Sequence, residues 1–195
     1  SGAEVPYDTV GLGAAPSELS VVASWGNAIN GLSAVFELQL YDVSGATPQR
    51  VAKSAMLSAT TPNTILQIPD TAPVGEYRLV VVRLAQDEGT VDPALWIGTV
   101  GDSDKLEWRT FDRSAGGDVV GPVSLGHAAD GSAVGVAAVD QATPTVPEMF
   151  TAPGPGTLRF EPYDPSSPVP AQALPTPVTV PAPQIAGIDG VRTSF

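Results

Sequence analysis

The alternation of apolar and polar positions in the first part of the chain is typical of half-buried β-strands. Residues 33–42 read SAVFELQLYD, which places Phe36, Leu38 and Leu40 on one face. One continuous apolar face with a period of two predicts a strand that packs on a core from one side. Residues 76–84, EYRLVVVRL, are dense in β-branched side chains and predict the strongest strand of the chain.

Other short apolar runs follow the same pattern, and Gly and Pro separate them. These runs predict strands at residues 19–25, 50–57, 64–68, 94–100 and 105–111, with turns at 11–13, 43–48 and 69–75. No segment has a helix-length period of 3.6 with caps. We therefore expect residues 1–114 to form an all-β, antiparallel, jelly-roll-like sandwich. Its expected core is Trp25, Phe36, Leu38, Leu40, Tyr77, Leu79 and Val81.

Residues 115–195 differ in kind, because 12 of the 20 prolines lie between Pro144 and Pro183. Proline removes a backbone donor, so we expect this stretch to be extended and unable to build strand ladders. The run Ser132–Val139, SAVGVAAV, predicts a strand buried on both faces, as in a parallel sheet. Standing alone, residues 141–195 are expected to pack poorly.

The charge balance argues against two classes of binding partner. With 21 acidic and 9 basic residues the chain carries a net charge of −12, which argues against nucleic acid and anionic membrane partners. No cysteine is present, so disulfides and thiol chemistry are excluded. No apolar run approaches the length of a membrane span, and the first residues are not expected to form a signal peptide. The low Lys and Arg content favours a secreted or cell-surface bacterial protein.

Few residues are candidates for a catalytic or metal-binding role. His127 is the single histidine, and it is either a general base near Asp130 or Asp140 or an ordinary loop residue. No G-x-S-x-G motif accompanies it, so no Ser–His–Asp triad can be argued. The acidic loops at 87–92 and 102–104 have oxygen ligands that calcium prefers, but a solvated acidic rim is the simpler interpretation. We expect no metal and no cofactor.

Three tryptophans are candidates for a ligand-facing surface. Trp25, Trp96 and Trp108 each lie in a predicted strand. They could stack on a carbohydrate, or they could pack in the core or at a sheet edge.

Three blocks in the second part resemble subtilisin-like serine proteases. Residues 126–140, GHAADGSAVGVAAVD, are similar to the stretch of that family that leads into a strand of the form A-V-G-A-V-D. Residues 148–155, EMFTAPGP, look like its S-F-S-S-x-G-P, and residues 183–195, PQIAGIDGVRTSF, look like its P-D-I-x-A-P-D-G-V-x-T-S-F. In the family, the last block precedes the G-T-S-x-A-x-P segment that carries the nucleophile.

The resemblance implies that the catalytic groups lie outside these 195 residues, since no residue here matches a member of the triad. One weaker match concerns the oxyanion donor. Residues 24–27, SWGN, resemble the family's S-A-G-N motif, in which the Asn27 position would donate to the developing oxyanion. The other interpretation of the same residues is a sandwich strand that ends in a turn.

The first part resembles the prepeptidase C-terminal type of β-sandwich that some of these proteases carry as an insert. The matching segments are LSVVASW at 19–25, FELQLYD at 36–42 and GEYRLVV at 75–81. The residues at 34–37, AVFE, stand where related modules hold calcium-binding aspartates.

Three hypotheses follow from these observations. The first is a non-catalytic part of a secreted subtilisin-like endopeptidase, with an accessory sandwich at 1–114 and a partial catalytic-domain segment at 115–195. Its partners would be the remainder of the catalytic domain and, through the parent, a peptide substrate. The second is a stand-alone adhesin or carbohydrate-binding module with a cell-wall spacer. The third is an intact enzyme of an unfamiliar type.

Overall fold

The computed structural model of the protein describes residues 7–88, 93–110, 130–148, 151–152 and 154–191. This described part contains strands and one 3-10 turn, Ser103–Lys105, but no α-helix, so the all-β prediction is confirmed. Contacts between residues divide the chain into two units. The first comprises residues 1–115 together with 163–171, and the second comprises residues 116–162 and 172–195.

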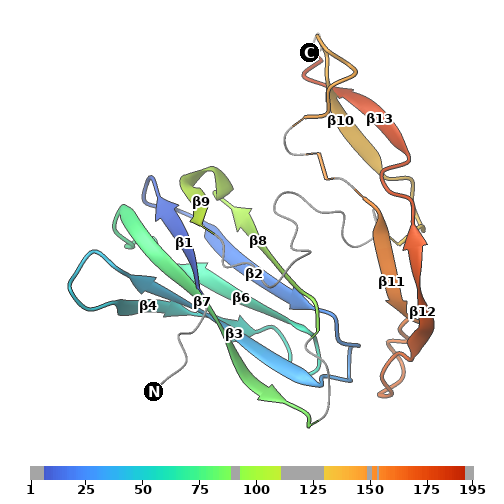
Figure 1. The fold of residues 1–195 in the computed structure, drawn as a ribbon, viewed down its shortest axis with the longest axis horizontal. Coiled ribbons are helices and arrows are strands. Elements are labelled where there is room, and N and C mark those ends of the chain that lie inside the picture. Colours follow the sequence, from blue (N-terminus) through green and yellow to red (C-terminus); the bar gives the residue numbers. More distant parts are fainter. Residues whose placement is uncertain (1–6, 89–92, 111–129, 149–150, 153, 192–195) are drawn as a thin grey trace. The chain divides into compact units, whose positions relative to one another are not determined.

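The first unit is built from two antiparallel sheets (Figure 1). A five-stranded sheet has the order β4-β3-β7-β1-β9, and a four-stranded sheet has the order β5-β6-β2-β8. The strands are β1 (Tyr7–Leu12), β2 (Leu19–Trp25), β3 (Ala34–Asp42), β4 (Gln49–Lys53), β5 (Ala55–Met56), β6 (Asn63–Ile68), β7 (Gly75–Gln86), β8 (Leu95–Gly101) and β9 (Leu106–Thr110). Each predicted strand of residues 19–111 has a counterpart among them.

The core of this unit lies between the two sheets. Alternate residues of β2 and β3 are buried, as a period of two requires. One cluster joins residues of both sheets, among them Val21, Leu38, Leu66 and Leu79. At the end of the sandwich the Trp25 ring meets the Phe36 ring edge-on, at 5.4 Å between centroids. All seven predicted core residues lie inside, with Val81 only partly buried.

Polar contacts at Ser54 and Tyr77 fix the chain at turning points. Between β4 and β5 the chain passes from one sheet to the other at Ser54, whose hydroxyl accepts from the Leu38 amide at 2.8 Å. The Thr64 hydroxyl of β6 donates to the same Ser54 oxygen at 2.7 Å. The Tyr77 hydroxyl donates to the Pro73 carbonyl four residues upstream, a tyrosine-corner arrangement. Burial raises the pKa of Tyr77, and the Asp42 carboxylate adds to this rise.

The prediction of a turn at Gly11-Leu-Gly13 is wrong for its first two residues. Gly11 and Leu12 end β1, which pairs with β7 from Tyr7↔Val80 to Leu12↔Gly75. Val10 and Leu12 are buried in the core, so tertiary pairing outweighs the weak strand preference of glycine.

The second unit holds two small sheets of two strands each. In the first, β10 (Val136–Asp140) pairs in parallel with β13 (Ile185–Asp189), residue for residue. In the second, β11 (Gly156–Phe160) pairs antiparallel with β12 (Ala173–Val180). Among the described residues of this unit most side chains are exposed or half-buried, while Val139 and Ala182 are buried.

The expectation that the proline-rich stretch cannot build strand ladders is wrong. Strand β12, ALPTPVTV, contains Pro175 and Pro177 and still pairs with β11. The pairing passes from Leu158↔Val178 directly to Phe160↔Ala173, so both prolines lie in an irregular stretch of β12 without a direct partner. Among the described residues, β12 is hydrogen-bonded in a ladder with β11 alone. Proline is tolerated at such edges and bulges because the ladder does not need its missing donor there.

Candidate functional site

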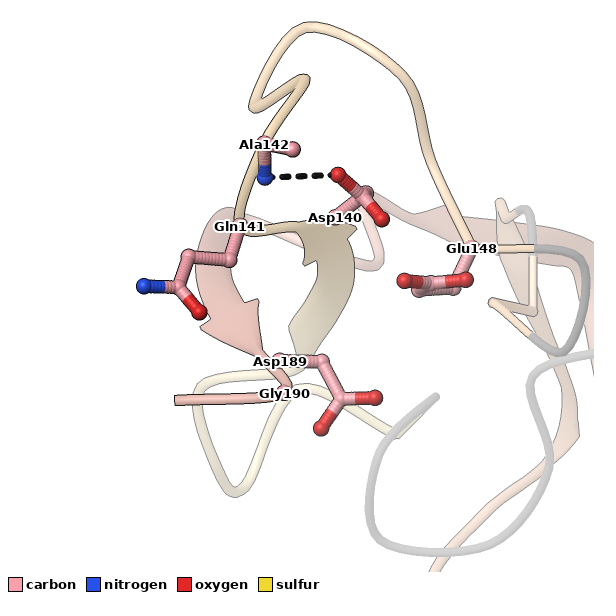
Figure 2. Close-up of a pocket in the computed structure, with 6 residues that line it drawn as sticks. All are labelled: Asp140, Gln141, Ala142, Glu148, Asp189 and Gly190. Carbon is pink, nitrogen blue, oxygen red and sulfur yellow. Dashed lines mark hydrogen bonds between the residues drawn. The ribbon is translucent and has the colours of Figure 1, made fainter. Parts of the chain in front are cut away.

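Three acidic side chains of the second unit line a hollow at the carboxyl end of the parallel pair. Asp140 and Asp189 end β10 and β13 and are direct partners in the pairing. A hollow of about 390 Å³ opens there, and its lining consists of Asp140, Gln141, Ala142, Glu148, Asp189 and Gly190. Figure 2 shows the carboxylates of Asp140, Glu148 and Asp189 around this hollow. The carboxyl ends of parallel strands are common ligand sites in α/β proteins.

Asp140 is held by the turn that follows β10. Its Oδ1 accepts from the amides of Ala142 at 2.6 Å and Thr143 at 2.8 Å, and from the Thr143 hydroxyl at 3.1 Å. These hydrogen bonds, those from Thr143 first, lower the pKa of Asp140. The group is therefore ionised at neutral pH and is an acceptor rather than a general acid.

Glu148 reaches the hollow because the chain folds back along β10. Its amide donates to the Ala138 carbonyl at 3.0 Å, and the Asp140 amide donates to the Val146 carbonyl at 3.3 Å. The Thr151 hydroxyl accepts from the Ala138 amide at 3.1 Å and donates to the Ala138 carbonyl at 2.6 Å. This returning segment covers the edge of β10 that faces away from β13.

The lining of the hollow offers acceptors for a positively charged group. Three carboxylates supply acceptors, but neither a nucleophile nor a base is paired with them among the lining residues. Across the described part of the chain, no group of three or more histidine and acidic side chains could hold a metal ion. Three carboxylates around one hollow suit a cationic group.

Asn27, the candidate oxyanion donor, shapes a turn of the sandwich. Its side-chain oxygen accepts from the amides of Ser33 at 3.2 Å and Ala34 at 3.1 Å. Its side-chain nitrogen donates to the Ser33 hydroxyl at 2.9 Å. Through these contacts Asn27 closes the connection between β2 and β3. Its role as an oxyanion donor stays a prediction.

The three tryptophans do not form one surface. Trp25 is buried, and its indole N–H donates to the Ala34 carbonyl at 3.1 Å. Trp108 is half-buried against the core and lies opposite Val10 in the pairing of β1 and β9. Trp96 is half-buried in β8, between Leu95 and Ile97, which both pack on the core, so its ring lies on the outer face of the four-stranded sheet.

One residue of the predicted acidic loops, Asp102, is used in local structure. Asp102 accepts from the Lys105 ammonium at 2.6 Å and from the Ser17 amide and hydroxyl, each at 2.9 Å. These contacts, Lys105 first, hold the pKa of Asp102 well below its usual range.

Asp92 and His127 lie outside the described residues. In the second unit Asp130 accepts from the Ser132 amide and hydroxyl at 2.7 and 2.6 Å.

Sequence reasoning considered Asp140 only as a partner for His127 and did not single out Glu148 or Asp189. The available signal was an aspartate directly after each of two apolar runs, VAAVD and IAGID. Parallel pairing of those runs could not be deduced from either run alone.

Comparison with known proteins gives no assignment, because no family model, curated protein or solved structure matches the chain. In the described residues no helix is long and apolar enough to cross a membrane.

Proposed function

We propose that this chain is a non-catalytic portion of a secreted, bacterial, subtilisin-like serine endopeptidase. The sandwich is an accessory insert that contributes to substrate binding, to gating or to stability. The second unit is a segment of the catalytic domain. Its partners are the remainder of that domain and, through it, a peptide or protein substrate.

The parallel pairing of β10 with β13 is the observation that supports this proposal most. Strand β10 lies in the first of the three protease-like blocks and β13 lies in the last. They are separated by more than forty residues, yet they pair without a register shift from Val136↔Ile185 to Asp140↔Asp189. A domain built on a parallel sheet requires this direction of neighbouring strands.

The apolar faces of this pair add support. Val136, Ile185 and Ile188 are each more than half exposed. Parallel strands are usually covered on both faces by helices, whereas the described residues contain no α-helix. The pair therefore has the composition of strands inside an α/β domain, and the covering layers would come from the remainder of the parent.

The coding sequence around the chain tests the proposal. We expect a G-T-S-x-A-x-P block shortly after Phe195, and blocks with the catalytic Asp and His before Ser1. A reading frame that continues for several hundred residues on either side without these blocks would overturn the proposal.

A further inference from the structure

The connection between β2 and β3 forms a firmly held loop at one end of the sandwich. We call residues 26–31 the rim loop. The Gly26 amide donates to the Ala94 carbonyl at 2.9 Å, and the Asn30 amide donates to the Thr60 carbonyl at 2.8 Å. The Asn27 side chain closes the far side of the loop through Ser33 and Ala34. The loop is thus fixed by distant contacts, to Thr60 and Ala94, and by the local contacts of Asn27.

Asn30 is the residue of the rim loop whose side chain contacts a distant segment of the chain. Its φ of 63° lies in the left-handed region, which non-glycine residues seldom adopt. In this conformation its side-chain nitrogen donates to the Tyr163 hydroxyl at 3.3 Å and to the Ser167 carbonyl at 3.4 Å. The amide therefore contacts both a side chain and the backbone of a segment more than 130 residues away.

Gly31 supplies the space beside that amide. A Cβ atom added at Gly31 would lie 2.8 Å from Cβ and 3.1 Å from Cγ of Pro170. A proline ring cannot bend away as a long side chain can, so the close approach requires glycine at this position.

The occupant of this surface is the chain's own segment 163–171, YDPSSPVPA, which groups with the sandwich. Local hydrogen bonds set its shape. The Asp164 carboxylate accepts from the Ser166 amide at 2.9 Å and the Ser166 hydroxyl at 2.6 Å, and the Asp164 carbonyl accepts from the Ser167 amide at 3.1 Å. Three prolines restrict the segment further, and such preorganisation lowers the entropy cost of docking.

From these contacts we infer that the rim loop is a docking site for a proline-containing peptide segment, and that residues 163–171 occupy it as an intramolecular strap. Asn30 binds a backbone carbonyl and a tyrosine hydroxyl of the segment, while Gly31 receives a proline ring. This role is independent of any protease activity and assigns to the sandwich a specific interaction with an extended chain.

The test compares two substitutions in the full chain, Asn30→Gly and Gly31→Ala, with Gly45→Ala as control. Asn30→Gly removes the amide but keeps a residue suited to a positive φ. Gly31→Ala places a methyl group against Pro170. At Gly45 the added Cβ would meet only the Thr47 carbonyl oxygen, at 3.8 Å, so that substitution is expected to be harmless.

The readout is NMR of the Ser166, Ser167 and Val169 amides. Their own hydrogen bonds stay within the segment, so their chemical shifts and heteronuclear NOEs report whether the segment is docked on the rim loop. Loss of about 1 kcal/mol of docking contacts raises the ratio of undocked to docked segment about fivefold. We expect the three amides to shift and their NOEs to fall in Asn30→Gly and Gly31→Ala but not in Gly45→Ala, with unchanged amide exchange in β2 and β7. Wild-type shifts and NOEs of the three amides in Asn30→Gly, with the sandwich intact, would overturn the inference whatever Gly31→Ala does.

Discussion

Truncation of Leu38 tests whether the sandwich core is assigned correctly. Leu38 is 0% exposed and belongs to the cluster between the two sheets. Leu38→Ala removes three carbon groups, which accounts for a loss of about 2.4 kcal/mol at about 0.8 kcal/mol per group. The cavity left behind adds to this value, so we expect the free energy of unfolding to fall by about 2–5 kcal/mol. The hydrogen bond from the Leu38 amide to the Ser54 hydroxyl is retained, because it uses only the backbone of Leu38.

The measurement is urea unfolding followed by tryptophan fluorescence, because Trp25 and Trp108 contact the sandwich core. Leu57→Ala is the matched control, since Leu57 is 66% exposed and its truncation should change stability by no more than about 0.5 kcal/mol. A loss below about 0.5 kcal/mol in Leu38→Ala would refute the assignment of this face of β3 to the core.

Three further substitutions probe single contacts. Tyr77→Phe removes the hydroxyl bonded to the Pro73 carbonyl, and unfolding in urea should show a loss of about 1 kcal/mol. Asp102→Asn should lower the free energy of unfolding at pH 7, because the Asp102 carboxylate is stabilised in the folded state and its pKa is lowered there. The difference from wild type should shrink as the pH falls below about 4, which acid unfolding curves of both proteins would show. Thr151→Val keeps the shape but removes the hydroxyl bonded to Ala138, so the Ala138 amide should exchange about fivefold faster; an unchanged rate would contradict the edge contact.

The strands of the sandwich could be predicted from sequence because each has one apolar face. Alternation in residues 33–42 identifies the buried side of β3 without knowledge of its neighbours. Strand β1 was not predicted, because Gly11 favours a turn locally. Only pairing with β7, together with burial of Val10 and Leu12, outweighs that preference.

The second unit was harder to predict because its structure depends on pairing between distant segments. Pro175 and Pro177 remove two donors, and this loss matters only if those positions face a partner. Their place opposite an irregular part of β11 depends on register, which local sequence does not specify. The acidic hollow has the same origin, since Asp140 and Asp189 meet only when β10 and β13 pair in parallel.

Under the proposed function, the chain is part of a serine endopeptidase whose catalytic groups lie outside residues 1–195. A fluorophosphonate probe tests this proposal when it is applied both to this chain and to the natural protein that contains it, and the labelled serine is mapped by mass spectrometry. We predict no labelling of the isolated chain, and labelling of the natural protein at a serine beyond Phe195. Labelling of a serine within residues 1–195, or none in the natural protein in its active form, would refute the proposal.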